Sequence, residues 1–204
     1  MYESEFKKSL DIGKATERAV IVIPKLRQYA LTPLTDISNG GAPRLIGPFG
    51  DPMARALVAP DFSADRPGEH YGLEIKGKTR ADETRTTGEL EHAIGRRLLL
   101  AYLEWQRRIE RKVVLIVDEK STGEILAASL DRLMTGEYLN LHDGQIYKRP
   151  RETFDNKMDR GGMAFFGRSQ FMVLHQREAP DAPLFKNVRL APTLPFATSL
   201  RDVR

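Results

Sequence analysis

The spacing of apolar residues along the chain predicts a hairpin in its first half. Two short apolar runs, at 56–59 and 71–75, flank a polar segment that contains Pro67 and Gly68. Apolar runs of strand length on either side of proline and glycine are typical of two strands joined by a turn. A longer unbroken run, KVVLIVD at Lys112–Asp118, predicts a strand that is buried on both faces.

Helices are predicted where apolar residues recur every three or four positions. The clearest runs from Gly88 to Glu110, with one buried stripe that holds Leu90, Ile94, Leu98, Ala101, Trp105 and Ile109. An earlier helix begins near the N-terminus, with an interruption at Gly13, and Pro24 either kinks it or starts a new turn. Its β-branched run at 20–23 also suits a strand, but the charged residues on both sides favour a helix.

These elements follow the order helix, three strands, helix, strand. A helix that leads into a buried strand indicates a crossover to a parallel neighbour. We therefore expect an α/β fold with a mixed central sheet flanked by helices over residues 1–135. Residues 136–204 are predicted to form a β-rich C-terminal extension packed on this core, with strands at 144–148 and 163–174 around a charged loop, and a partly extended tail. Residues 124–134 suit a strand or a short helix.

The predicted hairpin carries the most informative charged residues. Because side chains alternate along a strand, Glu74 and Lys76 share one face while Ile75 points to the other. A buried acid is costly without a partner, and Asp61 on the neighbouring strand can complete the site. Two carboxylates suit a hard divalent cation, and the lysine can orient or deprotonate a water. The same residues also fit a hairpin with one exposed Glu–Lys pair.

Pro60-Asp61 followed by Glu74-Ile75-Lys76 resembles the PD-(D/E)xK nuclease superfamily, and the resemblance extends from about Glu17 to about Asp118. It implies a restriction-endonuclease-like core that cuts phosphodiester bonds with Mg²⁺, for which Mn²⁺ can substitute. By this resemblance Asp61, Glu74 and the Ile75 carbonyl hold the metal, and Lys76 positions the water. The early helix would supply a third acid, Glu17, although this residue equally suits an exposed helix start.

The charge of the chain is compatible with a nucleic-acid partner. The 204 residues include 32 Lys and Arg against 28 Asp and Glu, which gives a net charge of +4. Three groups of residues are candidates for contacts with nucleic acid, and each also suits an ordinary solvated surface. They are Lys78, Arg80 and Arg85 in the loop after the hairpin, His92 and Arg96 on the long helix, and Lys148, Arg149 and Arg151 in the extension.

Several other chemistries are excluded by the sequence. The chain has no cysteine, so thiolate metal sites and disulfides are ruled out. No glycine-rich phosphate loop or nucleophile elbow occurs. No apolar run reaches the length of a membrane span and no signal peptide is recognisable, so we expect a cytoplasmic location. The predicted function is that of a Mg²⁺-dependent deoxyribonuclease. Its expected partner is DNA, and a homodimer or a larger complex is compatible with this function. The alternative is an inactive module of the same fold that binds nucleic acid or a protein.

Overall fold

A six-stranded mixed sheet forms the centre of the molecule. The computed structural model describes residues 2–34, 44–45, 57–83, 90–135, 137–139, 146–148, 151–153, 162–177 and 200–203. The strand order is β1-β4-β5-β8-β9-β14, and only β5 and β8 run parallel. The strands are β1 (Ala30–Pro33), β4 (Phe62–Arg66), β5 (Glu69–Lys78), β8 (Lys112–Glu119), β9 (Glu124–Ser129) and β14 (Met172–Gln176).

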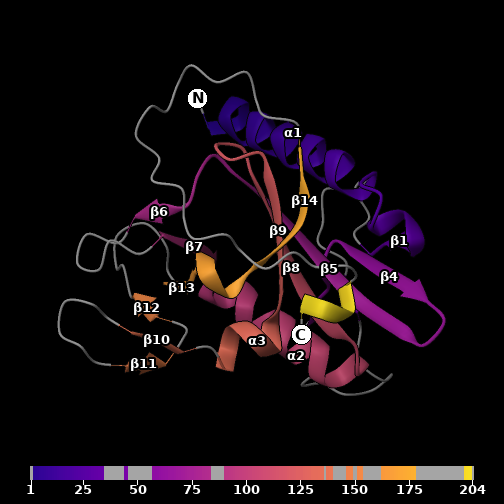
Figure 1. Ribbon diagram of the computed structural model, residues 1–204. Helices are drawn as coiled ribbons and strands as arrows, with labels where there is room; N and C mark the ends of the chain where they lie inside the picture. The colour runs from indigo at the N-terminus through magenta and orange to yellow at the C-terminus, as the bar shows by residue number, and fades with distance from the viewer. Residues whose placement is uncertain are drawn as a thin grey trace.

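Helices cover both faces of this sheet (Figure 1). Helix α1 (Tyr2–Ile21) packs on one face with the 3-10 turns η1 (Leu26–Gln28) and η4 (Leu200–Val203). Helices α2 (Arg96–Ile109) and α3 (Leu130–Thr135) pack on the other face. Helix α2 lies between β5 and β8 in the chain, as the parallel pairing of these strands requires. The predicted mixed α/β class, with a mixed central sheet flanked by helices, is confirmed. Within the described residues, seven strands rather than three lie between α1 and α2, and three of them, β1, β4 and β5, belong to the central sheet.

A second, four-stranded sheet lies beside the α2 face in the order β12-β13-β7-β6. Its strands are β12 (Arg151–Thr153), β13 (Met163–Gly167), β7 (Leu90–Gly95) and β6 (Asp82–Glu83). The 3-10 turn η3 (Arg168–Gln170) links β13 to β14. Two short antiparallel pairs complete the described chain: β2 (Arg44–Leu45) with β3 (Leu57–Val58), and β10 (Glu137–Leu139) with β11 (Ile146–Lys148). No helix in the described parts of the chain is long and apolar enough to cross a membrane.

The helix predicted from Gly88 to Glu110 is wrong in its first part. Leu90–Gly95 form β7, and α2 begins only at Arg96. The spacing of Leu90 and Ile94 suits either period, and pairing decides between them, because β7 has a neighbour on each side, β13 and β6. His92 and Arg96 therefore do not share a helical stripe.

The hairpin has different bounds from those predicted. Its first strand is β4, at 62–66 rather than 56–59, so Asp65 and Arg66 belong to the strand and not to the loop. The turn consists of Pro67 and Gly68, and Gly68 has a φ of 74°, which glycine adopts without steric cost. Leu57 and Val58, from the run predicted as the first strand, instead pair with β2 in a separate two-stranded sheet. The extension's strands at 163–167 and 172–176 are confirmed, but Arg151–Thr153 form a strand where a loop was predicted.

Helix α1 confirms the helical interpretation of the β-branched run as far as Ile21. The interruption predicted at Gly13 is absent. The helix ends at Ile21, and a new turn at Pro24 leads into η1, as the second of the two alternatives for Pro24 predicted. Residues 124–134 combine both predicted alternatives, as β9 followed by α3.

Candidate metal and catalytic site

Asp61 and Glu74 are brought together by the register of the hairpin. Phe62 pairs with Leu73 across antiparallel β4 and β5, so Asp61, directly before β4, lies opposite Glu74. The Asp61 Oδ2 atom accepts a hydrogen bond of 2.8 Å from the backbone N–H of Ile75. This bond fixes the Asp61 carboxylate at the edge of β5, beside the residue whose carbonyl was predicted as a ligand.

Glu74 is a buried acid with few partners. Its side chain is 1 % exposed, and the Lys76 ammonium forms an ion pair with Oε1. Neither carboxylate oxygen has a partner with the geometry of a hydrogen bond among the described residues. The Tyr102 hydroxyl, from α2, also faces the carboxylate and acts on its pKa. Lys76 itself keeps a 35 % exposed side chain, so the pair opens to solvent on the lysine side.

The pKa values around this pair are perturbed by burial. Desolvation raises the pKa of Glu74 to about 7, and the charge of Asp61 adds to this rise while Lys76 opposes it. Desolvation also raises the pKa of Asp61, against the hydrogen bond from Ile75 and the charge of Lys76. Burial disfavours the charged form of Lys76, but the acids around it outweigh burial and raise its pKa. Perturbations of this kind mark candidate functional sites.

Glu17 approaches the same end of β5 from α1. Burial raises the pKa of its half-buried carboxyl, and the charge of Asp61 raises it further, whereas Lys76 and Lys14 lower it. Glu17 is thus within electrostatic reach of Asp61 and Lys76. Within the described ranges, however, no three His, Asp or Glu side chains gather closely enough to hold a metal ion. Asp61 and Glu74 are therefore the core of the candidate metal site, with Glu17 beside it.

The basic residues predicted to contact nucleic acid are only partly described. Lys78 is half-buried at the end of β5. Its carbonyl accepts a 2.9 Å hydrogen bond from the backbone N–H of Lys120, directly after β8, so the backbone that leaves the site is held beside the end of β8. Arg80 is exposed beyond it, and Arg96 is half-buried at the start of α2. Lys148 and Arg151 lie in β11 and β12, where only the backbone is described, and Arg85 and Arg149 lie outside the described residues.

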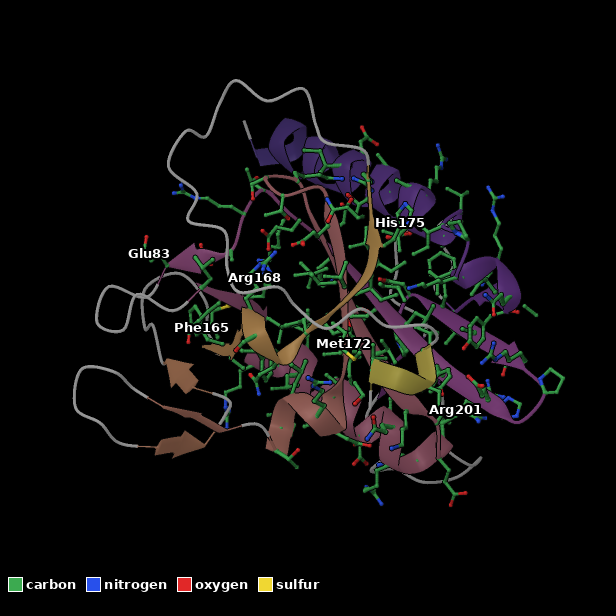
Figure 2. All side chains as sticks on the ribbon, viewed as in Figure 1. Glu83, Phe165, Arg168, Met172, His175 and Arg201 are labelled. Atoms are coloured by element: carbon green, nitrogen blue, oxygen red, sulfur yellow. The ribbon has the colours of Figure 1, made fainter. Side chains whose placement is uncertain are left out.

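His92 does not face solvent, contrary to its predicted place on a helix surface. It is 2 % exposed in β7, and its Nε2 atom lies 2.9 Å from Glu119 Oε2. The same oxygen accepts a 2.9 Å hydrogen bond from Nε of Arg168, which also pairs with Glu124. Figure 2 shows Arg168 directed into the molecule from η3. Because His92 is enclosed in this Glu119 network, a phosphate contact from its predicted position is not available to it.

Two features of the site escaped the sequence patterns. Tyr102 belongs to the buried stripe of α2 and so resembles an ordinary core residue. A signal was nevertheless present, since a tyrosine hydroxyl on a buried stripe needs a polar partner. The Glu119 network gave no such signal, because Arg168 is 49 residues from Glu119 in the chain.

No protein-family model matches the chain, and no curated protein matches it. Among solved structures, it is similar to Hjc, a Holliday junction resolvase from Archaeoglobus fulgidus, with 10% identity over 78% of this chain and 85% of that one, at a TM-score of 0.43. It is also similar to D212, a nuclease from a fusselovirus, with 13% identity over 84% of each chain and a TM-score of 0.35. Both similarities are weak, and the fold is defined by the strand order and register of this chain itself.

Proposed function

We propose that the protein is a metal-dependent nuclease that hydrolyses DNA phosphodiester bonds at Asp61, Glu74 and Lys76. The observation that carries the proposal is the Glu74 carboxylate, buried opposite Asp61 with only the Lys76 ammonium and the Tyr102 hydroxyl as polar partners among the described residues and with its pKa raised to about 7. A structural acid in this position would be expected to have its oxygens satisfied. An acid that is left short of partners, beside a second acid, suits a site that takes up a cation.

The donor atoms fit Mg²⁺, with Mn²⁺ as a substitute. Mg²⁺ prefers oxygen ligands and is commonly held by one or two carboxylates while it keeps several waters. Asp61 and Glu74 would provide the two carboxylates, with the Ile75 carbonyl as a neutral oxygen donor. A pair of acids without a third in the cluster is compatible with this ion. When bound, the metal lowers the pKa of a water and offsets charge on the phosphate.

Protein groups around the two carboxylates would position the water and the metal-binding acids. Lys76 has a raised pKa and therefore stays protonated near neutral pH, which favours a role as donor over a role as base. Its side chain is partly exposed, so the ammonium can position a water or offset charge that develops on a phosphate oxygen. The Ile75 N–H orients Asp61, and the Tyr102 hydroxyl favours the charged form of Glu74.

Glu17 and the basic residues complete the proposal. Glu17 is proposed as the third acid, acting beside the Asp61–Glu74 pair. The DNA backbone is proposed to contact Lys78, Arg80, Arg85, Arg96, Lys148, Arg149 and Arg151. Lys78, Arg80 and Arg96 are each at least partly exposed, which supports this assignment.

The test combines DNA cleavage with metal binding. Purified protein is incubated with supercoiled, linear and branched DNA, and with RNA, in Mg²⁺, Mn²⁺ or EDTA. Lys76→Ala should reduce cleavage by roughly 10²–10³-fold, as loss of a transition-state donor does, while salt-dependent DNA binding persists. Lys112→Ala is the matched control, because Lys112 pairs with Asp131 on the surface at the other end of β8.

Titration calorimetry with Mn²⁺ tests the metal site independently of cleavage. Asp61→Asn should weaken Mn²⁺ binding sharply, whereas Asp65→Asn, whose carboxylate pairs with His70 and Arg111 near the far end of β4, should not. Equal Mn²⁺ affinity in wild type and Asp61→Asn would remove the metal assignment. DNA binding by a wild type that cleaves no substrate would favour the inactive binding module instead.

A further inference from the structure

Gly77 on β5 is in unusually close contact with α1. A Cβ atom built at this glycine would lie 2.6 Å from Oγ1, 3.3 Å from Cγ2 and 3.4 Å from Cβ of Thr16. The first distance is shorter than packed heavy atoms tolerate, since protein interiors are already close-packed. With threonine at position 16, the helix can therefore lie at this distance from β5 because residue 77 has no side chain.

Thr16 is the residue through which this contact reaches the candidate site. It is 2 % exposed, and it directly precedes Glu17 in α1. Successive residues of a helix are rotated by about 100°, so seating Thr16 on β5 turns Glu17 toward the flank of the strand. Asp61 and Lys76 both act on the pKa of Glu17, which agrees with this placement.

The close contact does not extend to Gly13, the glycine of α1 itself. Gly13, which precedes Thr16 by about one turn of α1, would place a Cβ with no atom within 4 Å. The described part of α1 thus has room at Gly13 but not where Thr16 meets Gly77. Gly77 also directly follows Lys76, so the contact lies at the end of β5 that carries the site.

We propose that Gly77 is a positioning residue of the nuclease site: by lacking a side chain it seats Thr16 against β5 and so holds Glu17 beside Asp61 and Lys76. This inference rests on the proposed nuclease function. It adds to that function a residue with no polar side chain and no reactive atom, which acts only through the distance between α1 and β5.

Thermal unfolding in EDTA tests the close contact between Thr16 and Gly77 without reference to cleavage. Gly77→Ala should lower the melting temperature, and adding Thr16→Ala should restore most of the loss, because only the 3.4 Å contact with Cβ then remains. Adding Thr16→Val instead should restore little, since valine keeps a branch at the Oγ1 position. Gly13→Ala is the control on the same helix and should not lower the melting temperature. Equal melting temperatures for the Thr16→Ala and Thr16→Val double variants would contradict the claim that Gly77 makes room for the Thr16 side chain.

Cleavage by folded protein, measured below the melting temperature of every variant, tests the positioning role. Gly77→Ala should reduce cleavage by roughly 100-fold, the scale expected when a group in a reacting site is misplaced by about 1 Å. Thr16→Ala should rescue it, and Thr16→Val should not. Because the proposed effect acts through Glu17, adding Glu17→Gln to Gly77→Ala should cause little further loss.

The two readouts separate the possible failures. Full cleavage by folded Gly77→Ala, or a full additional loss from Glu17→Gln in that background, would overturn the positioning role while leaving the nuclease function intact. If the wild type cleaves nothing, the nuclease function fails and takes the positioning role with it. The melting temperatures still decide in that case whether Gly77 sets the distance of α1 from β5.

Discussion

Glu74 and Glu119 are two buried acids in closely similar places with opposite electrostatics. They lie on the α2-facing side of the parallel strands β5 and β8, where Glu74 pairs in register with Leu115 and Lys78 with Glu119. Their side chains are 1 % and 2 % exposed. The pKa of Glu74 is raised to about 7, whereas that of Glu119 is lowered to about 2.

The difference comes from the partners and not from burial. Burial favours the neutral form of both acids, but at Glu119 the hydrogen bond with His92 and the charge and hydrogen bond of Arg168 outweigh it. Glu74 has the Lys76 ion pair on one side and the charge of Asp61 on the other. At about 1.4 kcal/mol per pKa unit, the two shifts correspond to roughly 3 kcal/mol each with opposite signs. Burial alone therefore does not distinguish the candidate site from the Glu119 network, whereas the partners of each acid do.

The largest effect on stability is expected at Glu119. Glu119→Gln removes the charge that compensates Arg168, which is 6 % exposed and would then pair only with Glu124. Breaking a buried ion pair on one side costs about 3–5 kcal/mol. Urea unfolding at pH 7.5 in EDTA should show this loss, and Glu104→Gln, in an exposed cluster with Arg107 and Arg108, serves as the control. A midpoint equal to that of wild type would mean that the network adds nothing to stability.

Glu74→Gln should change how the stability of the protein depends on pH. Because the folded pKa of about 7 lies above the ordinary value of 4.5, the folded state binds the extra proton between these values. The stability contributed by Glu74 is therefore complete below pH 4.5 and is lost as pH rises toward 7, by roughly 3 kcal/mol. In EDTA the glutamine variant should be more stable than wild type at pH 8, and its urea midpoint should change less between pH 5 and pH 8.

The pH dependence that remains in Glu74→Gln is assigned to Asp61 and Glu17, whose pKa values are also raised. Glu119 behaves in the opposite way, since its contribution is present above pH 4.5 and is lost as pH falls toward 2. Parallel pH profiles for wild type and Glu74→Gln would contradict the assignment of the pKa near 7 to Glu74.

Tyr102→Phe should have the smallest effect of the three. The hydroxyl favours the charged form of Glu74, so its loss should cost about 1 kcal/mol when Glu74 is ionised. The urea midpoint in EDTA should therefore fall more at pH 8 than at pH 5. Tyr71→Phe is the matched control, because its hydroxyl lies 3.4 Å from Glu69, whose pKa is lowered by Arg66 and so does not titrate in this range. If Tyr102→Phe lowers the urea midpoint equally at both pH values, the Tyr102 hydroxyl does not stabilise the charged form of Glu74.

The parts of the fold that were predicted correctly have local causes. The run KVVLIVD has too many consecutive apolar residues for a half-exposed element, and it forms β8 in the middle of the sheet. The helical interpretation failed at Leu90–Gly95, where the decisive neighbour, β13, lies about 70 residues further along the chain. Periodicity alone cannot detect a partner strand at that distance.

The candidate site follows the same division. The proximity of Asp61, Glu74 and Lys76 could be predicted because the motif lies within one hairpin, where strand alternation fixes which side chains share a face. Tyr102 reaches Glu74 only through the packing of α2, and the seat of Thr16 on Gly77 only through the packing of α1. Those contacts depend on tertiary structure. The roles assigned to Asp61, Glu74, Ile75, Lys76, Glu17 and the basic residues all remain predictions.

The hairpin also has a consequence for folding. Asp61 and the Ile75 amide are only 14 residues apart in the chain, and a two-residue turn joins their strands. Arg168 must close a loop of 49 residues to reach Glu119. Contacts of short sequence separation form at lower entropic cost and earlier than long ones. During synthesis Asp61 and Glu74 can therefore come together as soon as β4 and β5 have emerged. Arg168, which compensates the charge of Glu119, is synthesised much later.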